Sequence, residues 1–494
     1  MSDPSSGRKT NLFRKFLHNK VIFYVFSRYL ISAVSFLTSL LLALKLSPFY
    51  LGIWGAIMLV RRYFQLVNFG IPDSASVLIV QNFDDKNRTE IIESTSVFLT
   101  FILGALAIIT FVALSAFQFP FIEKYELNEK WLFICVVVVF TYFNDLFFKI
   151  YRTKGKVAEL TFYQSIAQIL CFIAIFVARD ARLVWILLLC YMVGYMMAFL
   201  VFIRGKSICF KLKRISFQVS KQIISKGFFL FLYNTSFYFI MLSTRSFISS
   251  CNSVNNFGLF TFSFTLSNGV IVLLDALSSL IMPKMIDKFL TGDENAHKSI
   301  LGFVKDNYIF LSFFISFAII AILPLALEFF PAYHDTFSTI CYLTITSSVF
   351  SCCYGLTSYL MAKNHERVLA LLALIVLAVN VVLTFFVTKY FPGSIEYPCI
   401  VVLFSYFLFL TACYWTFKKK SGYRGVKMSE ICLSPVFVIP AVAALVISFF
   451  KLYYLSVIPA LIFVLMGYKN VSVLYASFVK LLNKPNIIDI HHDK

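Results

Sequence analysis

Apolar runs of about 18 residues or more recur along the whole chain, and they limit the protein to one class of fold. Hydrophobic residues make up 60% of the 494 residues, whereas charged residues make up only 14%. A water-soluble domain could not bury that much apolar surface, and a transmembrane barrel would show short alternating segments instead. The sequence therefore predicts an all-α polytopic membrane protein.

The apolar runs divide into about fourteen predicted transmembrane helices. They lie at 21–44, 50–70, 94–119, 132–151, 160–178, 183–203, 227–248, 257–281, 307–330, 336–361, 368–391, 398–417, 433–449 and 453–468. The second is a weaker prediction because of its arginines, and the seventh because it contains Asn234, Thr235, Ser236 and Arg245. With both termini in the cytoplasm, the inner segments hold most of the 44 Lys and Arg residues, as the positive-inside rule requires. Deleting either weak helix would reverse every later loop and abolish this asymmetry.

Several common functions find no support in the sequence. The net charge of +20 reflects basic inner loops, of which 204–226 alone holds seven Lys and Arg residues, so it does not indicate a nucleic-acid partner. The eleven cysteines form no C-x-x-C pair and the six histidines are scattered, so no metal site is predicted. The triplet Gly205-Lys206-Ser207 lacks the earlier glycine of a phosphate-binding loop. We therefore predict no cofactor.

A short motif appears twice, at the outer end of the second helix of each half. The first copy contains Gly52-Ile53-Trp54 and the second contains Phe257-Gly258-Leu259-Phe260, with Gly52 and Gly258 in equivalent places. The first and seventh helices also run in the same direction. The sequence therefore predicts two six-helix lobes, 1–205 and 206–420, related by a pseudo-two-fold axis along the membrane normal. Two extra helices and a cytoplasmic tail would occupy 421–494.

These motifs carry a family resemblance. The segments Ala43-Leu44-Lys45-Leu46-Ser47-Pro48, Gly52-Ile53-Trp54, Asn68-Phe69-Gly70-Ile71 and Asn256-Phe257-Gly258-Leu259-Phe260 resemble those of Wzx-type O-antigen flippases. These proteins are polysaccharide-repeat exporters of the multidrug/oligosaccharidyl-lipid/polysaccharide exporter superfamily. One departure is that Thr244 precedes Arg245, where the family commonly has an Asp-Arg pair.

The resemblance implies a substrate, a place in the cell and partners. The substrate would be an undecaprenyl-diphosphate-linked oligosaccharide, moved from the inner to the outer leaflet of the bacterial cytoplasmic (inner) membrane. The partners would be membrane lipids, a polysaccharide polymerase and a chain-length regulator. The same resemblance implies a transporter rather than an enzyme.

Two adjacent arginines, Arg61 and Arg62, lie within the second predicted span. A charge at the centre of the bilayer costs roughly 2.5 to 3.5 kcal/mol by insertion scales, so it persists only where it faces protein or water. Arg61, Gln65 and Asn68 share one helix face at i, i+4 and i+7, whereas Arg62 lies about 100° round. These residues predict a cavity that binds an anion. The alternative for each arginine is an ion pair with a neighbouring helix, or a side chain that reaches the interface.

Four further residues complete the predicted substrate-binding set. Arg28 lies in the first span, Asn234 and Arg245 lie in the seventh, and Asn268 lies in the eighth. Arg28 is close to the inner end of its span, so reaching the interface is an equally good interpretation. Arg245 lies at the outer end of its span and is the weakest of the arginine candidates.

Three ionisable residues are candidates for gating or ion coupling. Asp145 and Lys149 stand at i and i+4 of one span, where they would neutralise each other as a structural pair or as a gate. Asp275 is the deepest carboxylate of the second lobe, and it would partner an arginine or take up a coupling proton.

The sequence leaves three alternatives to a repeat-unit flippase. A multidrug antiporter would need carboxylates, and the first lobe offers only Asp73 and Asp145. The lipid II flippase of peptidoglycan assembly is a closer alternative. A membrane-embedded polymerase or ligase would need a sizeable outer loop, and the outer loops are short.

Arginine suits a diphosphate because its planar guanidinium donates paired hydrogen bonds to phosphate oxygens. The sequence does not choose between protons, sodium and membrane potential as the driving force.

Overall fold

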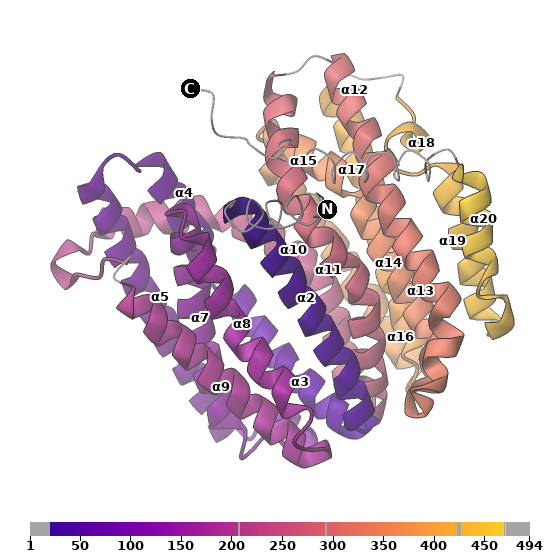
Figure 1. Ribbon diagram of the computed structural model, residues 1–494, viewed down its shortest axis with the longest axis horizontal. Coiled ribbons are helices and arrows are strands. Elements are labelled where there is room, and N and C mark those ends of the chain that lie inside the picture. The colour runs from indigo at the N-terminus through magenta and orange to yellow at the C-terminus, as the bar shows by residue number, and fades with distance from the viewer. Residues whose placement is uncertain (1–19, 206–207, 292–293, 422–425, 469, 471–494) are drawn as a thin grey trace, which may run out of the picture. The chain divides into compact units, whose positions relative to one another are not determined.

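The computed structural model describes residues 20–205, 208–291, 294–421, 426–468 and 470 (Figure 1). In these residues every regular element is helical. The chain divides into two compact units, the first formed by 1–265 with 366–398 and the second by 266–365 with 399–494. Helix α11 continues from the first unit into the second, and so does α17.

The first unit contains most of the N-terminal helices. They are α2 (Lys20–Lys45), α3 (Pro48–Leu66), α4 (Ile71–Gln81), α5 (Lys86–Ala116), α6 (Pro120–Lys124), α7 (Trp131–Thr153), α8 (Val157–Ala174), α9 (Asp180–Arg204), the 3-10 turn η1 (Leu212–Arg214), α10 (Phe217–Cys251), the start of α11 (Val254–Thr291) and α16 (Glu366–Tyr390). The second unit contains the rest of α11, α12 (Glu294–Phe303), the π-helical η2 (Val304–Ile309), α13 (Phe310–Glu328), η3 (Pro331–Thr336), α14 (Phe337–Cys352), α15 (Tyr354–Ala362), most of α17 (Glu396–Ser421), α18 (Met428–Ile431), α19 (Pro435–Phe449), η4 (Tyr453–Leu455) and α20 (Ile458–Met466).

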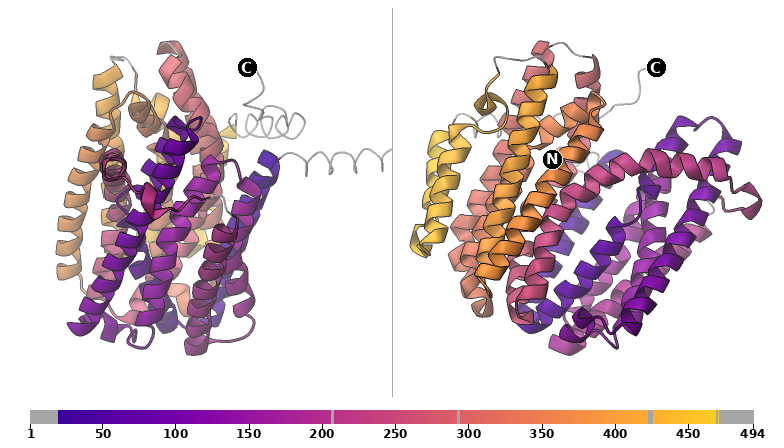
Figure 2. Two further views of the ribbon diagram at one scale, coloured as in Figure 1. Left: turned by 90° about the vertical axis from the view of Figure 1, so that its left-hand side faces the viewer. Right: turned by 180° about the vertical axis from the view of Figure 1, so that it is seen from behind.

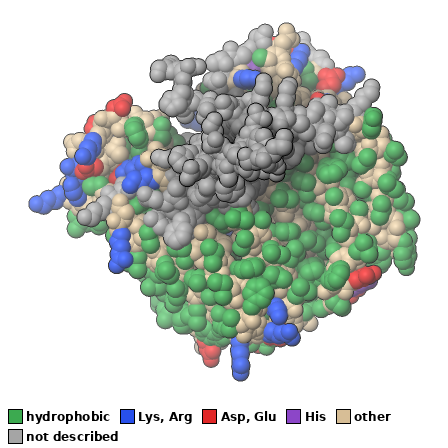
Figure 3. Space-filling view, viewed as in Figure 1, with side chains coloured by type: hydrophobic (Ala, Val, Ile, Leu, Met, Phe, Trp, Pro, Cys, Tyr) green, Lys and Arg blue, Asp and Glu red, His purple; other side chains and the backbone are tan. Residues whose placement is uncertain are grey.

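The all-α membrane fold is confirmed, and a helix covers each of the predicted spans. Eight helices of the described chain are long and apolar enough to cross a membrane, and four shorter ones are apolar as well. Large apolar side chains face outward, such as Ile109 and Val112 on α5, each 63% exposed. Figure 3 shows hydrophobic side chains over much of the face that it presents. Such a surface suits contact with lipid, because in water a patch of this kind would drive association. The lobe boundaries at 205 and 420 stay a prediction.

Helices α10 and α16 of the first unit are joined by a buried polar contact. The Asn380 amide donates to the Ile240 carbonyl at 2.9 Å, and to the hydroxyls of Ser243 and Thr244 at 3.1 Å each. Small polar residues let membrane helices approach closely and bond to each other. Thr244, which stands where the resembling family commonly has an aspartate, is therefore used in helix packing.

Replacing Asn380 with leucine is expected to lower stability by about 1 to 2 kcal/mol, because the Ile240 carbonyl would lose this donor in a buried site. A matched control is Asn307→Leu, since the half-buried Asn307 donates at the surface to the carbonyl of Phe303 one turn away. Thermal unfolding of both variants in the same detergent would measure the difference. Equal midpoints would show that the α10–α16 contact adds no stability.

The two motif glycines of the first unit meet where α3 crosses the start of α11. A Cβ atom added to Gly52 would collide with the carbonyl oxygen of Val254, and one added to Gly258 would collide with the carbonyl oxygen of Pro48. Each glycine therefore lies against the helix that carries the other. Only residues without a side chain allow two backbones to approach this closely.

The end of α3 differs from the prediction. The sequence places this span at 50–70, whereas α3 ends at Leu66 and the chain turns back into the unpredicted helix α4. The turn uses two left-handed residues, Phe69 (φ 50°) and Gly70 (φ 67°). A Cβ atom on Gly70 would lie 2.7 Å from the carbonyl oxygen of Gly227, so the turn also packs tightly against α10. Figure 2 shows that α10 is bent, its first turns running across the end of the unit where α4 lies.

Candidate functional site

Arg61 lies on α3 and is held by two tyrosines of α9. Its Nη1 donates to the Tyr195 hydroxyl at 3.0 Å. The guanidinium carbon lies 5.2 Å from the ring centroid of Tyr191 and 5.8 Å from that of Tyr195. The two tyrosines are four residues apart and therefore share one face of α9. Aromatic rings stabilise a cation without neutralising it, so the positive charge of Arg61 remains available.

Arg62 begins a chain of hydrogen bonds that leads to α7. Its Nη1 donates to Gln65 Oε1 at 2.9 Å, and Gln65 Nε2 donates to Asp145 Oδ2 at 3.0 Å. The guanidinium lies over the ring of Tyr238 on α10, 5.2 Å from its centroid. Gln65 therefore connects a membrane arginine to a membrane carboxylate without bringing the two charges into contact.

Arg245 on α10 is the most buried of the described membrane arginines. Its side chain is 8% exposed and lies over Phe264, with 4.5 Å between the guanidinium carbon and the ring centroid. Its Nε is buried and has no hydrogen-bond partner among the described residues. Arg245 also lies close enough to Arg62 for their charges to repel. A buried donor without a partner is costly, so Arg245 stays a candidate for contact with an anion.

These three arginines have no carboxylate within ion-pair distance in the described part of the chain. The ion pairs found there involve other cations, chiefly lysines. Asp145 interacts with Arg61 and Arg62 only through longer-range charge attraction. The alternative that each arginine forms an ion pair with a neighbouring helix is therefore wrong for the described residues. These three poorly compensated cations of one membrane unit, called here the arginine cluster, are candidates for binding an anion.

The predicted neutralisation of Asp145 by Lys149 is wrong. Lys149 instead pairs with Asp73 Oδ1 at 2.5 Å, while Asp145 accepts from Gln65. The reason is α4, which the sequence analysis did not predict and which carries Asp73 in its first turn. With Lys149 paired to Asp73, Asp145 remains the carboxylate that faces the arginines.

The structure gives no contact between the arginines and the remaining predicted site residues that it describes, Asn68 and Asn268. Asn68 lies beyond the end of α3, so the prediction that it shares a helix face with Arg61 is wrong; its Oδ1 accepts from the Gly70 backbone N–H at 2.9 Å. Asn268 is half-buried in the second unit. The side chains of three residues lie outside the described part of the structure: Arg28, Asn234 and Asp275.

The aromatic partners of the arginines were missed by the sequence analysis. The available signal was the pair Tyr191 and Tyr195, which are spaced by one helical turn within a span. Tyr238 shares a face of its predicted span with Arg245, but this spacing does not indicate its contact with an arginine of another helix, and Phe264 has no local signal.

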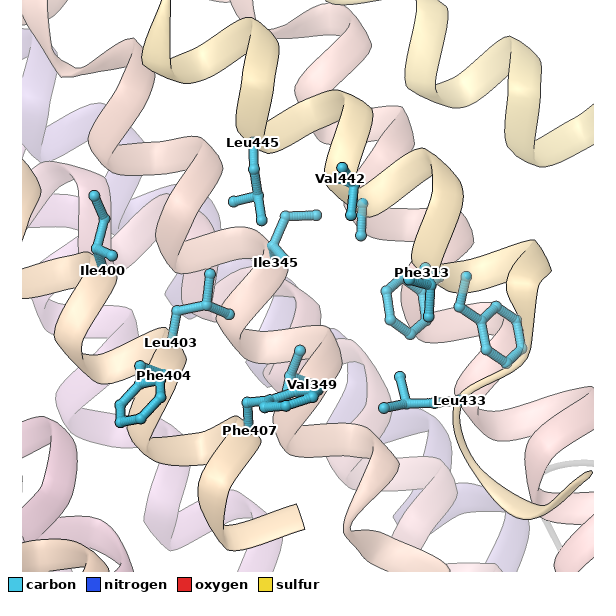
Figure 4. A pocket seen from close by; sticks show the side chains of 13 residues that line it. Phe313, Ile345, Val349, Ile400, Leu403, Phe404, Phe407, Leu433, Val442 and Leu445 are labelled. Atoms are coloured by element: carbon cyan, nitrogen blue, oxygen red, sulfur yellow. The ribbon is translucent and has the colours of Figure 1, made fainter. Parts of the chain in front are cut away.

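The second unit contains an apolar cavity of about 300 Å³ between α13, α14, α17 and α19 (Figure 4). All of its lining side chains are apolar, including Phe313, Phe404 and Phe437. Such a cavity offers no donor to a phosphate and suits hydrocarbon. It is therefore distinct in chemistry from the arginine cluster.

No protein-family model matches the chain, and no curated protein matches it in sequence.

Solved structures, in contrast, share its fold. An inward-facing multidrug resistance transporter of the MATE family, in the MOP superfamily, superimposes with a TM-score of 0.67 at 13% identity, covering 81% of this chain and 98% of that one. The lipid II flippase MurJ in an inward closed conformation gives a TM-score of 0.69 at 12% identity, covering 93% of this chain and 100% of that one. A MATE protein in a straight conformation gives 0.61 at 14% identity, covering 82% of this chain and 97% of that one. The protein is thus a multi-pass membrane protein with the fold of the MOP-superfamily transporters.

Proposed function

We propose that the protein moves an undecaprenyl-diphosphate-linked oligosaccharide, an O-antigen or other surface polysaccharide repeat unit, from the inner to the outer leaflet of the bacterial cytoplasmic membrane. The observation that carries this proposal is the cluster of Arg61, Arg62 and Arg245 without ion-pair partners among the described residues. A diphosphate has about two negative charges, and guanidiniums bind phosphate oxygens through paired, charge-assisted hydrogen bonds.

Transport would proceed by alternating access of the arginine cluster to the two sides of the membrane. Both termini would lie in the cytoplasm. A membrane potential that is negative inside favours outward movement of an anion by about 2.3 kcal/mol per charge per 100 mV. Membrane lipids, a polysaccharide polymerase and a chain-length regulator are the proposed partners.

The same cluster suggests how an ion could be coupled to transport. Gln65 bonds to both Arg62 and Asp145, so an anion at the arginine and a proton at the carboxylate would act on one chain of hydrogen bonds. We assign gating or coupling to Asp145, with Lys149 holding α4 against α7 through Asp73. Asp275 remains the candidate of the second lobe.

A lipid II flippase is the second candidate, because MurJ shares the fold over nearly the whole of this chain. The arginines do not distinguish the two substrates, since they would bind the diphosphate rather than the sugars. A multidrug antiporter is disfavoured, because three poorly compensated cations repel a cationic drug.

Reconstitution into liposomes tests the proposal. A fluorescent, short-chain polyprenyl-diphosphate oligosaccharide would be placed in both leaflets, and its accessibility to an external sugar-cleaving enzyme followed. In empty liposomes the enzyme should cleave only the lipid of the outer leaflet. With the protein present, we expect it to cleave the lipid of both leaflets. Failure to move the lipid together with efflux of a cationic dye would favour the antiporter. In cells, a viable deletion without surface polysaccharide favours the repeat unit, whereas a lethal deletion favours lipid II.

A further inference from the structure

A segment of the first unit presents two bulky apolar side chains that are largely exposed in the described part of the chain. This segment, residues 210–228, joins α9 to the membrane part of α10 and is called here the basic-aromatic segment. Its Phe217 side chain is 87% exposed and its Leu212 side chain is 70% exposed. Leaving a phenylalanine in water forfeits roughly 1.5 to 3 kcal/mol of burial free energy, so an unburied one needs an explanation.

The backbone just before the basic-aromatic segment and within its first half is fixed on α5. The backbone N–H of Cys209 donates to Glu93 Oε2 at 2.8 Å, and that of Ser216 donates to the Thr95 hydroxyl at 3.2 Å. Glu93 and Thr95 are both almost completely buried. The exposed side chains are therefore presented by an anchored backbone rather than by a free loop.

The first turns of α10 have two apolar faces. Val219 and Ile223 are buried where α10 packs on α4 and α5. Phe217, Ile224 and Phe228 are exposed, and their spacing places them together on another face of the helix. These turns run across the end of the unit, as Figure 2 shows, and not along the other helices. A helix with an exposed apolar face in this position is typical of one that lies in the membrane interface.

Positive charge accompanies the exposed apolar side chains. Arg214 pairs with Glu90 at 2.6 Å, and Lys211 lies 3.7 Å from the same carboxylate. Lys213 and Lys221 are exposed and have no ion pair among the described residues. Figure 3 shows Lys and Arg side chains gathered at the left edge of the molecule, at the end of this unit that carries the turn between α4 and α5. The segment therefore combines exposed aromatic rings with surplus positive charge.

We propose that the basic-aromatic segment binds anionic phospholipid head groups at the membrane surface. Phe217 and Leu212 would enter the boundary between head groups and acyl chains, while Lys213 and Lys221 attract the phosphates. Basic residues near an anionic leaflet each contribute on the order of a fivefold gain in binding, and apolar side chains add to it. The contact would anchor the inner end of α10, the helix that also carries Tyr238 and Arg245.

The test places a reporter at the segment itself. Full-length Phe217→Trp protein in phosphatidylcholine bilayers would receive either brominated phosphatidylglycerol or brominated phosphatidylcholine, and quenching of the added emission would be compared. We expect the anionic lipid to quench on the order of tenfold more effectively, and Lys213→Gln with Lys221→Gln to remove this preference. Lys418→Gln with Lys419→Gln is the matched control, since it removes the same charge at the end of α17 and should leave the preference unchanged.

Two results would overturn this proposal. Equal quenching by both lipids with the lysines intact would show that the segment contacts acyl chains without recognising head groups. No quenching by either lipid would show that Phe217 faces water or is covered by another protein. Neither result depends on which substrate the arginine cluster binds.

Discussion

Replacing Arg61 with alanine is expected to abolish transport while the protein still folds and inserts. The substitution removes the guanidinium that Tyr191 and Tyr195 position. It would also remove the two charge-assisted hydrogen bonds that this group would donate to a phosphate in the proposed function. Such bonds contribute about 1.5 to 3 kcal/mol each, so transport should fall by about a hundredfold or more. Arg61→Lys should rescue only partly, because an ammonium group keeps the charge but not the planar pair of donors.

The measurement is surface polysaccharide in a deletion strain complemented with each variant, normalised to the amount of membrane-inserted protein. Arg152→Ala is the matched control, since this exposed arginine of α7 also lies over an aromatic ring, that of Phe148, with its guanidinium carbon 6.0 Å from the ring centroid. Normal polysaccharide with Arg61→Ala would remove this residue from the mechanism.

Replacing Gly258 with valine should have the largest effect on stability. The new Cβ would collide with the Pro48 carbonyl oxygen, which is backbone and cannot rotate away as a side chain can. Overpacking of this kind costs about 1 to 3 kcal/mol even where side chains can adjust, so we expect a loss of about 3 kcal/mol or more. The α3–α11 crossing would separate, and α3 also carries Arg61 and Arg62.

Gly302→Val provides the matched control for this prediction. Gly302 lies in α12, and a Cβ atom there would meet nothing within 4 Å. The yield of monodisperse protein and its thermal midpoint in detergent should fall sharply for Gly258→Val and little for Gly302→Val. Equal behaviour of the two variants would mean that the crossing tolerates a side chain and that the motif glycine has another role.

The sequence predicts the helices well because a membrane span needs only a long apolar run. It predicts their ends poorly where a polar turn falls within such a run. The apolar residues Leu66, Val67 and Phe69 extend the second span to residue 70, although the backbone reverses at Phe69 and Gly70. Because the span was predicted too long, α4 and its Asp73 were not predicted as a separate helix. Asp145 was therefore predicted as the partner of Lys149, which pairs with Asp73 instead.

The candidate site could be predicted in part for the same reason. The cost of charge in a bilayer singles out Arg61, Arg62 and Arg245 without knowledge of the fold. Their partners depend on which helices become neighbours, and no local spacing encodes that. Tyr238 reaches Arg62 only because α10 packs beside α3, and Arg245 reaches Phe264 only because α11 follows α10 back. The predicted roles of Arg28, Asn234, Asn268 and Asp275 stay predictions.

The affinity of purified protein for farnesyl diphosphate and farnesol tests most directly whether Arg61, Arg62 and Arg245, which have no ion-pair partner among the described residues, bind a diphosphate. Titration calorimetry in detergent should show binding of the diphosphate that is stronger than binding of the alcohol by about a hundredfold. Combined Arg61→Gln, Arg62→Gln and Arg245→Gln substitutions should remove this difference. Equal affinity for the two lipids in the unaltered protein, or a difference that survives loss of all three guanidiniums, would contradict the account.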